Sequence, residues 1–150
     1  MTGSTVAVQV GLDAVLRAGA RRTLAERPSD TAFDLHFGSD VVVTTGQAAR
    51  IVAVLREAIL NSIDYAHPAG VPGRIEVCSA LERDGTMMIQ IADDGVGLPE
   101  GFDTLLDGGE GFHIMRRAGA ELGAVLSFKS SCLGLAVGLL LPTPVRGQSS

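Results

Sequence analysis

The segment RIEVCSALERDGTMMIQIADDGVG, residues 74–97, predicts a β-hairpin that runs directly into a glycine-rich loop. Apolar and polar residues alternate in both halves of the hairpin, and the Asp84-Gly85 pair between them favours a tight turn. Alternation has a period of two, so the carboxylate of Asp93 should point the same way as three large apolar residues of its strand. A carboxylate in that setting needs a hydrogen-bonding partner, because burying it unpaired is costly.

The sequence on either side of this hairpin predicts helices mixed with further strands. Apolar residues recur at helical spacing in three stretches, which end near Pro28, Pro68 and Gly123. The expected helices cover 11–26, 47–66 and 111–122, and the expected strands cover 33–37, 40–44, 74–81, 86–93, 124–129 and 134–141. Antiparallel hairpins, in place of alternating βα units, indicate an α+β two-layer sandwich with one sheet and helices packed on one face. We divide the chain into an N-terminal helical segment, 1–28, a main domain, 29–142, and a tail, 143–150.

Composition excludes several classes of function. The chain has 150 residues, 46% hydrophobic and 19% charged, with a net charge of −5. This balance excludes a disordered chain and a nucleic-acid binder that relies on a basic surface, so no nucleic-acid partner is expected. The single lysine, Lys129, leaves no Gly-Lys-Ser/Thr motif for a P-loop and no strand lysine of the eukaryotic protein-kinase type. A nucleotide would have to be bound by other chemistry.

The cysteines and the apolar runs indicate in which cellular compartment the chain is expected. Cys78 and Cys132 each lie in an apolar, strand-like run, which predicts buried free thiols and fits a reducing cytosol. The longest apolar run, 132–141, is far shorter than the roughly 20 residues that span a bilayer. The first ten residues lack the pattern of a signal peptide. We therefore expect a cytoplasmic chain without membrane contact.

The longest expected helix carries the first group of polar residues. Glu57, Asn61 and Asp64 are spaced four and three apart and should share one helix face. A carboxylate one turn before an amide can orient or deprotonate a hydroxyl group or water, and an amide oxygen can bind Mg²⁺. A solvated helix face explains the same spacing, so this group alone does not establish a site.

Two glycine-rich segments carry the second group. Gly95 and Gly97, directly after Asp93, let the backbone turn and approach a ligand closely. The segment Gly-Gly-Glu-Gly-Phe, 108–112, opens a helix whose free N–H groups can hold phosphates without a lysine. Residues 93–110 include six acids and no Lys or Arg, so a triphosphate beside them would need Mg²⁺ and backbone amides.

In this order, three motifs resemble the conserved boxes of the GHKL ATPases, which share the Bergerat nucleotide-binding fold. EAILNSIDYA, 57–66, resembles the N box, DDGVGLP, 93–99, the G1 box, and GEGFHIM, 109–115, the G2 box. Within the superfamily, the chain looks most like the catalytic ATP-binding domain of bacterial sensor histidine kinases, over about residues 30–142. The resemblance implies a mixed, largely antiparallel sheet and binding of Mg-ATP.

The resemblance also implies a role for residues of the first two boxes. Glu57 would activate or position the attacking group in phosphoryl transfer. Asn61 would hold the Mg²⁺ that bridges the phosphates, and Tyr65 would border the nucleotide. Asp93 would accept a hydrogen bond from the adenine amino group, which would answer the need for a partner.

The glycines and the last box complete the implied nucleotide site. Gly95 and Gly97 would shape the adenine side of the pocket, and residues 98–108 would form a lid over the nucleotide. Gly109 and Gly111 would close that lid over the phosphates, with Phe112 beside them in the nucleotide-binding set.

The function that follows is transfer of the γ-phosphoryl group of ATP to a histidine outside this chain, as in two-component signalling. His36, His67 and His113 do not resemble a phospho-acceptor, and no dimerising helical hairpin fits in residues 1–46. Asp64 stands where relatives usually carry a basic residue, and Glu110 adds an acid near the phosphates. Two alternatives therefore stay open: a kinase similar to the anti-sigma-factor serine kinases, acting on a serine-bearing antagonist, and a non-catalytic module that docks a partner under nucleotide control.

Overall fold

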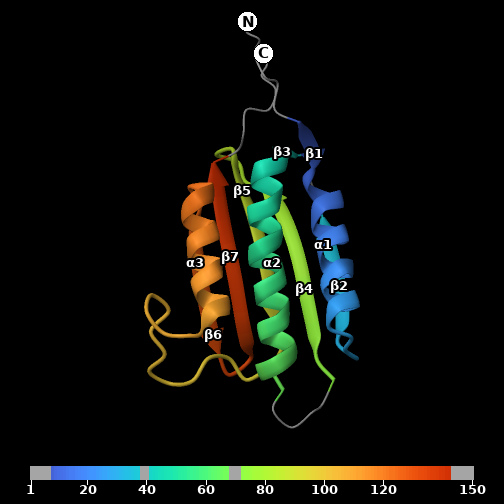
Figure 1. Cartoon of the computed structure of the whole chain (residues 1–150). Helices are drawn as coiled ribbons and strands as arrows, with labels where there is room; N and C mark the ends of the chain where they lie inside the picture. Colours follow the sequence, from blue (N-terminus) through green and yellow to red (C-terminus); the bar gives the residue numbers. More distant parts are fainter. Residues whose placement is uncertain (1–7, 38–40, 68–71, 143–150) are drawn as a thin grey trace, which may run out of the picture.

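The computed structural model describes residues 8–37, 41–67 and 72–142. These residues form three helices, a five-stranded sheet and a two-stranded sheet (Figure 1). The elements in chain order are β1 (Gln9–Gly11), α1 (Leu12–Glu26), β2 (Ala32–Phe37), β3 (Val42–Thr44), α2 (Thr45–Tyr65), β4 (Arg74–Leu81), β5 (Thr86–Asp93), α3 (Glu110–Leu122), β6 (Val125–Ser131) and β7 (Gly134–Pro142). The expected tail, 143–150, lies outside the described residues.

The larger sheet is mixed and largely antiparallel. Its strand order is β2-β4-β5-β7-β6, in which β2 runs parallel to β4 and every other neighbouring pair is antiparallel. The three helices cover one face of this sheet (Figure 1). This arrangement confirms the predicted two-layer α+β sandwich of the Bergerat type.

The core lies between the sheet and the helices. Leu55 of α2 and Ile89 of β5 are fully buried, and Leu12 and Leu16 of α1 belong to the same apolar cluster. Helix α1 packs along α2, so it helps to fix the helix that carries Glu57 and Asn61. Within the described residues, no helix combines the length and the apolar character that crossing a bilayer requires.

Local signals fix the start of α2 and the end of α3. Thr44 Oγ1 accepts a hydrogen bond from the backbone N–H of Gln47, and the Gln47 side chain accepts one from the N–H of Thr44, so α2 begins with a capping box. Gly123 ends α3 in the left-handed conformation, as expected from the sequence. The predicted hairpin of β4 and β5 is present over the predicted residues.

Two expectations from the sequence are wrong. Residues Gln9–Gly11 form strand β1, paired antiparallel with β3, where only a helical segment was expected. The cysteines are free but not buried: Cys78 is half-buried and Cys132 is exposed. Cys132 lies in the turn between β6 and β7, so no neighbouring strand covers it. Cys78 alternates with the buried Val77 and Ser79 along β4, so it lies on the face of the sheet that the helices leave open, and desolvation raises the pKa of its thiol.

Candidate functional site

A cavity of about 720 Å³ opens between the C-terminal half of α2, the end of β5, the loop that follows it and the start of α3. This volume lies in the range of small-molecule and cofactor pockets. Eight of the nine site residues expected from the sequence line it: Glu57, Asn61, Tyr65, Asp93, Gly97, Gly109, Gly111 and Phe112. The fold thus brings three segments that are far apart in the chain around one cavity.

Glu57 lies where α2 meets the start of α3. Its side chain is only 12% exposed, and its Oε2 accepts a hydrogen bond of 2.7 Å from Nη1 of Arg56. Arg56 also binds Glu26 at the end of α1, and this hydrogen bond, with the charges of Glu26 and Glu57, raises the pKa of Arg56. A side-chain carbon on Gly111 would lie 3.0 Å from Glu57 Oε1. The absence of a side chain at this glycine therefore keeps the space beside the carboxylate open.

Asp93, at the end of β5, has three hydrogen-bond donors. Ser62 Oγ donates to Oδ2 at 2.6 Å, and the backbone N–H groups of Gly95 and Leu135 donate to Oδ1 at 2.9 and 3.1 Å. The protein itself therefore supplies the hydrogen-bonding partners that the sequence predicted this carboxylate to need. Asp93 also lines the cavity, so it can accept a further hydrogen bond from a ligand.

Gly95 differs from the other expected site residues, because it does not line the cavity. A side-chain carbon there would lie 2.3 Å from the backbone oxygen of Ala66, and the neighbouring N–H of Val96 donates to that same oxygen at 2.9 Å. Gly95 therefore joins the loop to the end of α2. Gly97, with a φ of +79°, adopts the left-handed conformation and packs against the backbone of Ser131.

Asp94, next to the site, ties three segments together. Its Oδ1 accepts a hydrogen bond from the backbone N–H of Arg74 at 2.9 Å and lies 2.8 Å from Nε2 of His67. The bond from Arg74, followed by the contact with His67, lowers the pKa of Asp94. Through these bonds the end of α2 is fixed to the edge of β4 and to the end of β5.

The segment 98–108 is held against α3. The ring of Phe102 packs on Phe112 at a centroid distance of 5.1 Å, and Phe112 packs on Phe128 at 5.2 Å. Nη1 of Arg116 donates hydrogen bonds to the backbone oxygens of Thr104, at 2.8 Å, and Asp107, at 3.0 Å. The segment expected to act as a lid therefore has a defined position against α3, and Leu98, Phe102 and Gly108 of this segment line the cavity. Figure 1 shows its trace leading from the end of β5 to the start of α3.

The lining of the cavity is acidic. Four carboxylates line it, and among its described lining residues there is no Arg or Lys: the carboxylates are those of Glu57, Asp64, Asp93 and Glu110. Asp64 pairs with Arg27, which follows α1. The N-cap of α3 is Gly109, which has no side chain to cap the first N–H groups of the helix. A lining of this kind favours a polyphosphate that carries a divalent cation, and the amide oxygen of Asn61 is a suitable type of ligand for Mg²⁺.

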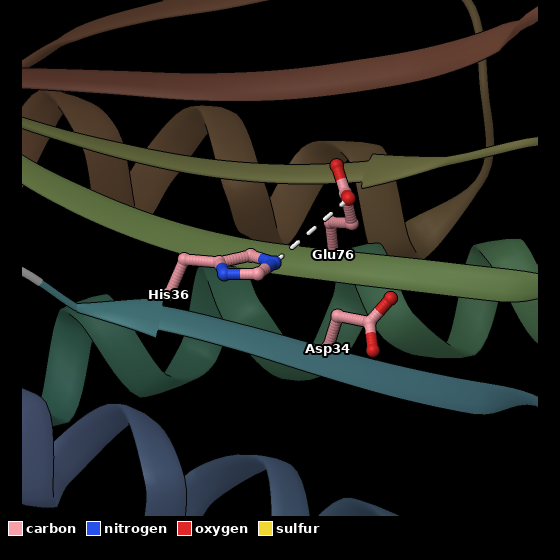
Figure 2. Close-up of side chains that lie close together, drawn as sticks. All are labelled: Asp34, His36 and Glu76. Carbon is pink, nitrogen blue, oxygen red and sulfur yellow. Dashed lines mark ion pairs between the residues drawn. The ribbon is translucent and has the colours of Figure 1, made fainter.

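A second group of titratable side chains lies on the open face of the sheet, away from the helices (Figure 2). Asp34 and His36 of β2 stand beside Glu76 of β4, with their ligand-type atoms within 4.8 Å of one another. Arg74 pairs with the carboxylate of Asp34. This cation competes with any metal ion for Asp34, and we assign the group no function.

Comparison with known proteins agrees with this geometry. Residues 46–143 match the model of the family described as histidine kinase-, DNA gyrase B-, and HSP90-like ATPases. The match includes α2, β5 and the start of α3, which surround the cavity. The chain belongs to this ATPase family.

Individual relatives of this ATPase domain are sensor histidine kinases. The chain is 29% identical over 103 residues to blue-light-activated histidine kinase 2 of Erythrobacter litoralis, covering 69% of this chain and 29% of that protein. It is 30% identical over 111 residues to the sensor histidine kinase PdtaS of Mycobacterium tuberculosis, covering 71% of this chain and 22% of that protein. The chain thus spans less than a third of the length of these relatives.

Solved histidine kinase domains share the fold of this ATPase domain. The histidine kinase domain of the Erythrobacter litoralis EL346 kinase superposes with a TM-score of 0.82 at 22% identity, over 95% of this chain and 70% of that one. The ATP binding domain of PrrB from Mycobacterium tuberculosis gives a TM-score of 0.70 at 23% identity, over 92% and 98% of the two chains.

Sequence reasoning missed several residues that support the site. Ser62 was given no role from the sequence, yet its hydroxyl donates a hydrogen bond to Asp93. Its position directly after Asn61 was the available signal. Arg116 and the backbone N–H of Leu135 gave no signal, because their contacts lie 9 to 42 residues away in the chain.

Proposed function

We propose that this chain is the ATP-binding catalytic domain of a two-component-type histidine kinase, which binds Mg-ATP and transfers the γ-phosphoryl group to a histidine outside the chain. One observation carries the proposal: one cavity of about 720 Å³ is surrounded by Glu57 and Asn61 of α2, Asp93 of β5 and the glycine-rich start of α3. Membership of the ATPase family and the kinase relatives support it.

Each wall of the cavity has a task in this proposal. Asp93 accepts a hydrogen bond from the adenine amino group, and Gly97 shapes the part of the cavity that holds the adenine. Tyr65, at the open edge of the cavity, borders the nucleotide. The first N–H groups of α3, at Gly109 and Gly111, hold the phosphates. Asn61 would hold Mg²⁺ when the nucleotide is bound. The ion would supply the positive charge that the lining of the cavity lacks.

Glu57 is the proposed catalytic residue. The acceptor imidazole nitrogen forms a bond to the γ-phosphorus while the bond from phosphorus to the bridging oxygen breaks, and ADP leaves. Glu57 accepts a hydrogen bond from the other, protonated ring nitrogen of the acceptor imidazole, which orients the ring, and takes up that proton as the new bond to phosphorus forms. Arg56 holds the carboxylate in place. Because there is little covalent work for the protein to do, positioning supplies most of the rate. A domain that uses ATP in this way is expected in the cytoplasm.

Two observations favour an alternative without turnover. Asp64 and Glu110 both line the cavity and add negative charge near the proposed phosphate path. A non-catalytic module that docks a partner under nucleotide control would tolerate this charge. The kinase similar to the anti-sigma-factor serine kinases remains the second alternative, since it needs the same cavity and differs in its acceptor.

Phosphate transfer from radiolabelled ATP tests the proposal. The full chain is incubated with radiolabelled ATP, Mg²⁺ and purified candidate acceptors. These are histidine-bearing helical domains and serine-bearing antagonist proteins that are encoded beside it. Transfer to histidine gives an acid-labile, base-stable label, whereas a phosphoserine is acid-stable. We expect the acid-labile label, and we expect Glu57→Gln to abolish it while ATP still binds. Glu82→Gln, on the exposed turn after β4, is the matched control. Labelled serine, or binding without transfer to any acceptor, would favour the corresponding alternative.

A further inference from the structure

The carboxylate of Asp93 is fixed at both of its oxygens. The two backbone donors, Gly95 and Leu135, both bind Oδ1, whereas the side chain of Ser62 binds Oδ2. A carboxylate oxygen accepts about two hydrogen bonds. Oδ1 is therefore fully used by the protein, and Oδ2 retains room for one more donor, which must come from the cavity that Asp93 lines.

Ser62 is buried and does not itself line the cavity. It is 8% exposed, in the last part of α2, directly after Asn61. Its bond to Oδ2, at 2.6 Å, has the short length of a hydroxyl bound to a carboxylate. Any effect of this hydroxyl on a ligand therefore passes through the carboxylate of Asp93.

We propose that Ser62 is a positioning residue that holds Oδ2 of Asp93 toward the exocyclic amino group of an aminopurine nucleotide, and so sets the preference of the cavity for bases that carry this group. The inference rests on the proposed nucleotide-binding function and adds a specificity determinant to it. The backbone bonds to Oδ1 alone leave the carboxylate free to turn about one anchored oxygen. The bond from Ser62 fixes the second oxygen and hence the plane of the group.

The inference predicts an effect that depends on the ligand. A nucleotide with the amino group gains from a fixed Oδ2. Purine riboside triphosphate, which lacks only that group, gains nothing from it. Removal of the Ser62 hydroxyl should therefore weaken the binding of ATP and leave the binding of purine riboside triphosphate unchanged. A merely structural role of Ser62 would alter both equally.

The test is a titration of the full chain, in Mg²⁺, with ATP and with purine riboside triphosphate. The unaltered chain should prefer ATP by about 10-fold or more, and Ser62→Ala should weaken ATP binding by roughly 5- to 10-fold. Ser79→Ala is the matched control, since Ser79 is also buried and also donates to an aspartate, Asp13, but lies on β4 outside the cavity. It should change neither affinity, and thermal unfolding should show that both variants fold.

Two results would overturn the inference while the unaltered chain binds ATP normally: unchanged ATP affinity in Ser62→Ala, or an equal loss for both nucleotides. A different result, in which the unaltered chain binds neither nucleotide, would refute the proposed nucleotide-binding function and the inference with it.

Discussion

A side-chain carbon on Gly111 would lie 3.0 Å from Oε1 of Glu57, so the first turn of α3 rests on the carboxylate of α2. This contact joins two segments that are more than fifty residues apart in the sequence. It places the N–H groups at the start of α3 beside the carboxylate that we propose as catalytic. This pair therefore defines the end of the cavity at which we propose that the phosphates bind.

Gly111→Ala should impair phosphoryl transfer more than nucleotide binding. The added methyl group would lie 3.0 Å from Oε1 of Glu57, which is tighter than ordinary van der Waals contact, so the Glu57 carboxylate must shift by a few tenths of an ångström. Because small displacements of a catalytic group are costly, we expect a fall in kcat of roughly 10-fold or more. Gly11→Ala, with open space around the position of the new carbon, is the control. Equal rates in the two variants would show that Glu57 has no positional role.

Gly95→Ala should destabilise the fold. The new carbon would lie 2.3 Å from the backbone oxygen of Ala66, and a backbone atom cannot move aside as a flexible side chain can. Overpacking of this kind costs about 1–3 kcal/mol in the free energy of unfolding, measured by denaturant titration. Gly46→Ala, in the first turn of α2 with its nearest neighbours 3.9 Å away, should instead stabilise by about 0.5–1 kcal/mol. The same sign for both substitutions would contradict the structure.

Arg116→Ala should loosen the segment 98–108. This residue donates to the backbone oxygens of Thr104 and Asp107, and the substitution leaves both oxygens without that partner. We expect faster amide hydrogen exchange in 103–108 and a several-fold weaker affinity for Mg-ATP. Arg117→Ala removes the neighbouring charge, which is exposed and pairs with Glu121, and should change neither quantity. Identical exchange in the two variants would show that Arg116 does not hold the segment 98–108 in place.

Asp94 should make a small, acid-sensitive contribution to stability. The N–H of Arg74 and the contact with His67 lower its pKa in the folded state. A carboxyl group with a lowered folded pKa stabilises the fold above its unfolded pKa of about 3.9, and this stability is lost as pH falls through the folded pKa. Its side chain is 54% exposed, so we expect at most about 1 kcal/mol.

Unfolding of Asp94→Ala and of the unaltered chain, measured from pH 7 to pH 3, checks this contribution. The difference in the free energy of unfolding should be constant near neutral pH and shrink below about pH 4. A difference that grows as the pH falls would have the wrong sign.

Local patterns in the sequence explain how much of this fold could be predicted. The hairpin of β4 and β5 was placed correctly because the alternation and the Asp-Gly turn lie within twenty residues. Strand β1 was missed because only three residues form it and its partner, β3, lies more than thirty residues away. The exposure of Cys132 depends on where β6 and β7 stop pairing, which its apolar neighbours do not reveal.

The candidate site shows the same division between local and distant information. The spacing on α2 placed Glu57 and Asn61 on one face, and both line the cavity. The hydrogen-bond partners of Asp93 could not be predicted, since Ser62 and Leu135 reach it from other elements. Gly95 carried a functional expectation, although its observed contact is with the backbone of Ala66.

Calorimetric titration of the full chain with ATP, with and without Mg²⁺, tests the central claim most directly. We predict saturable binding of one nucleotide per chain that weakens about 10-fold or more without Mg²⁺, and about 10-fold or more in Asp93→Asn. An affinity for ATP that is independent of both Mg²⁺ and Asp93, or no binding at all, would contradict the account.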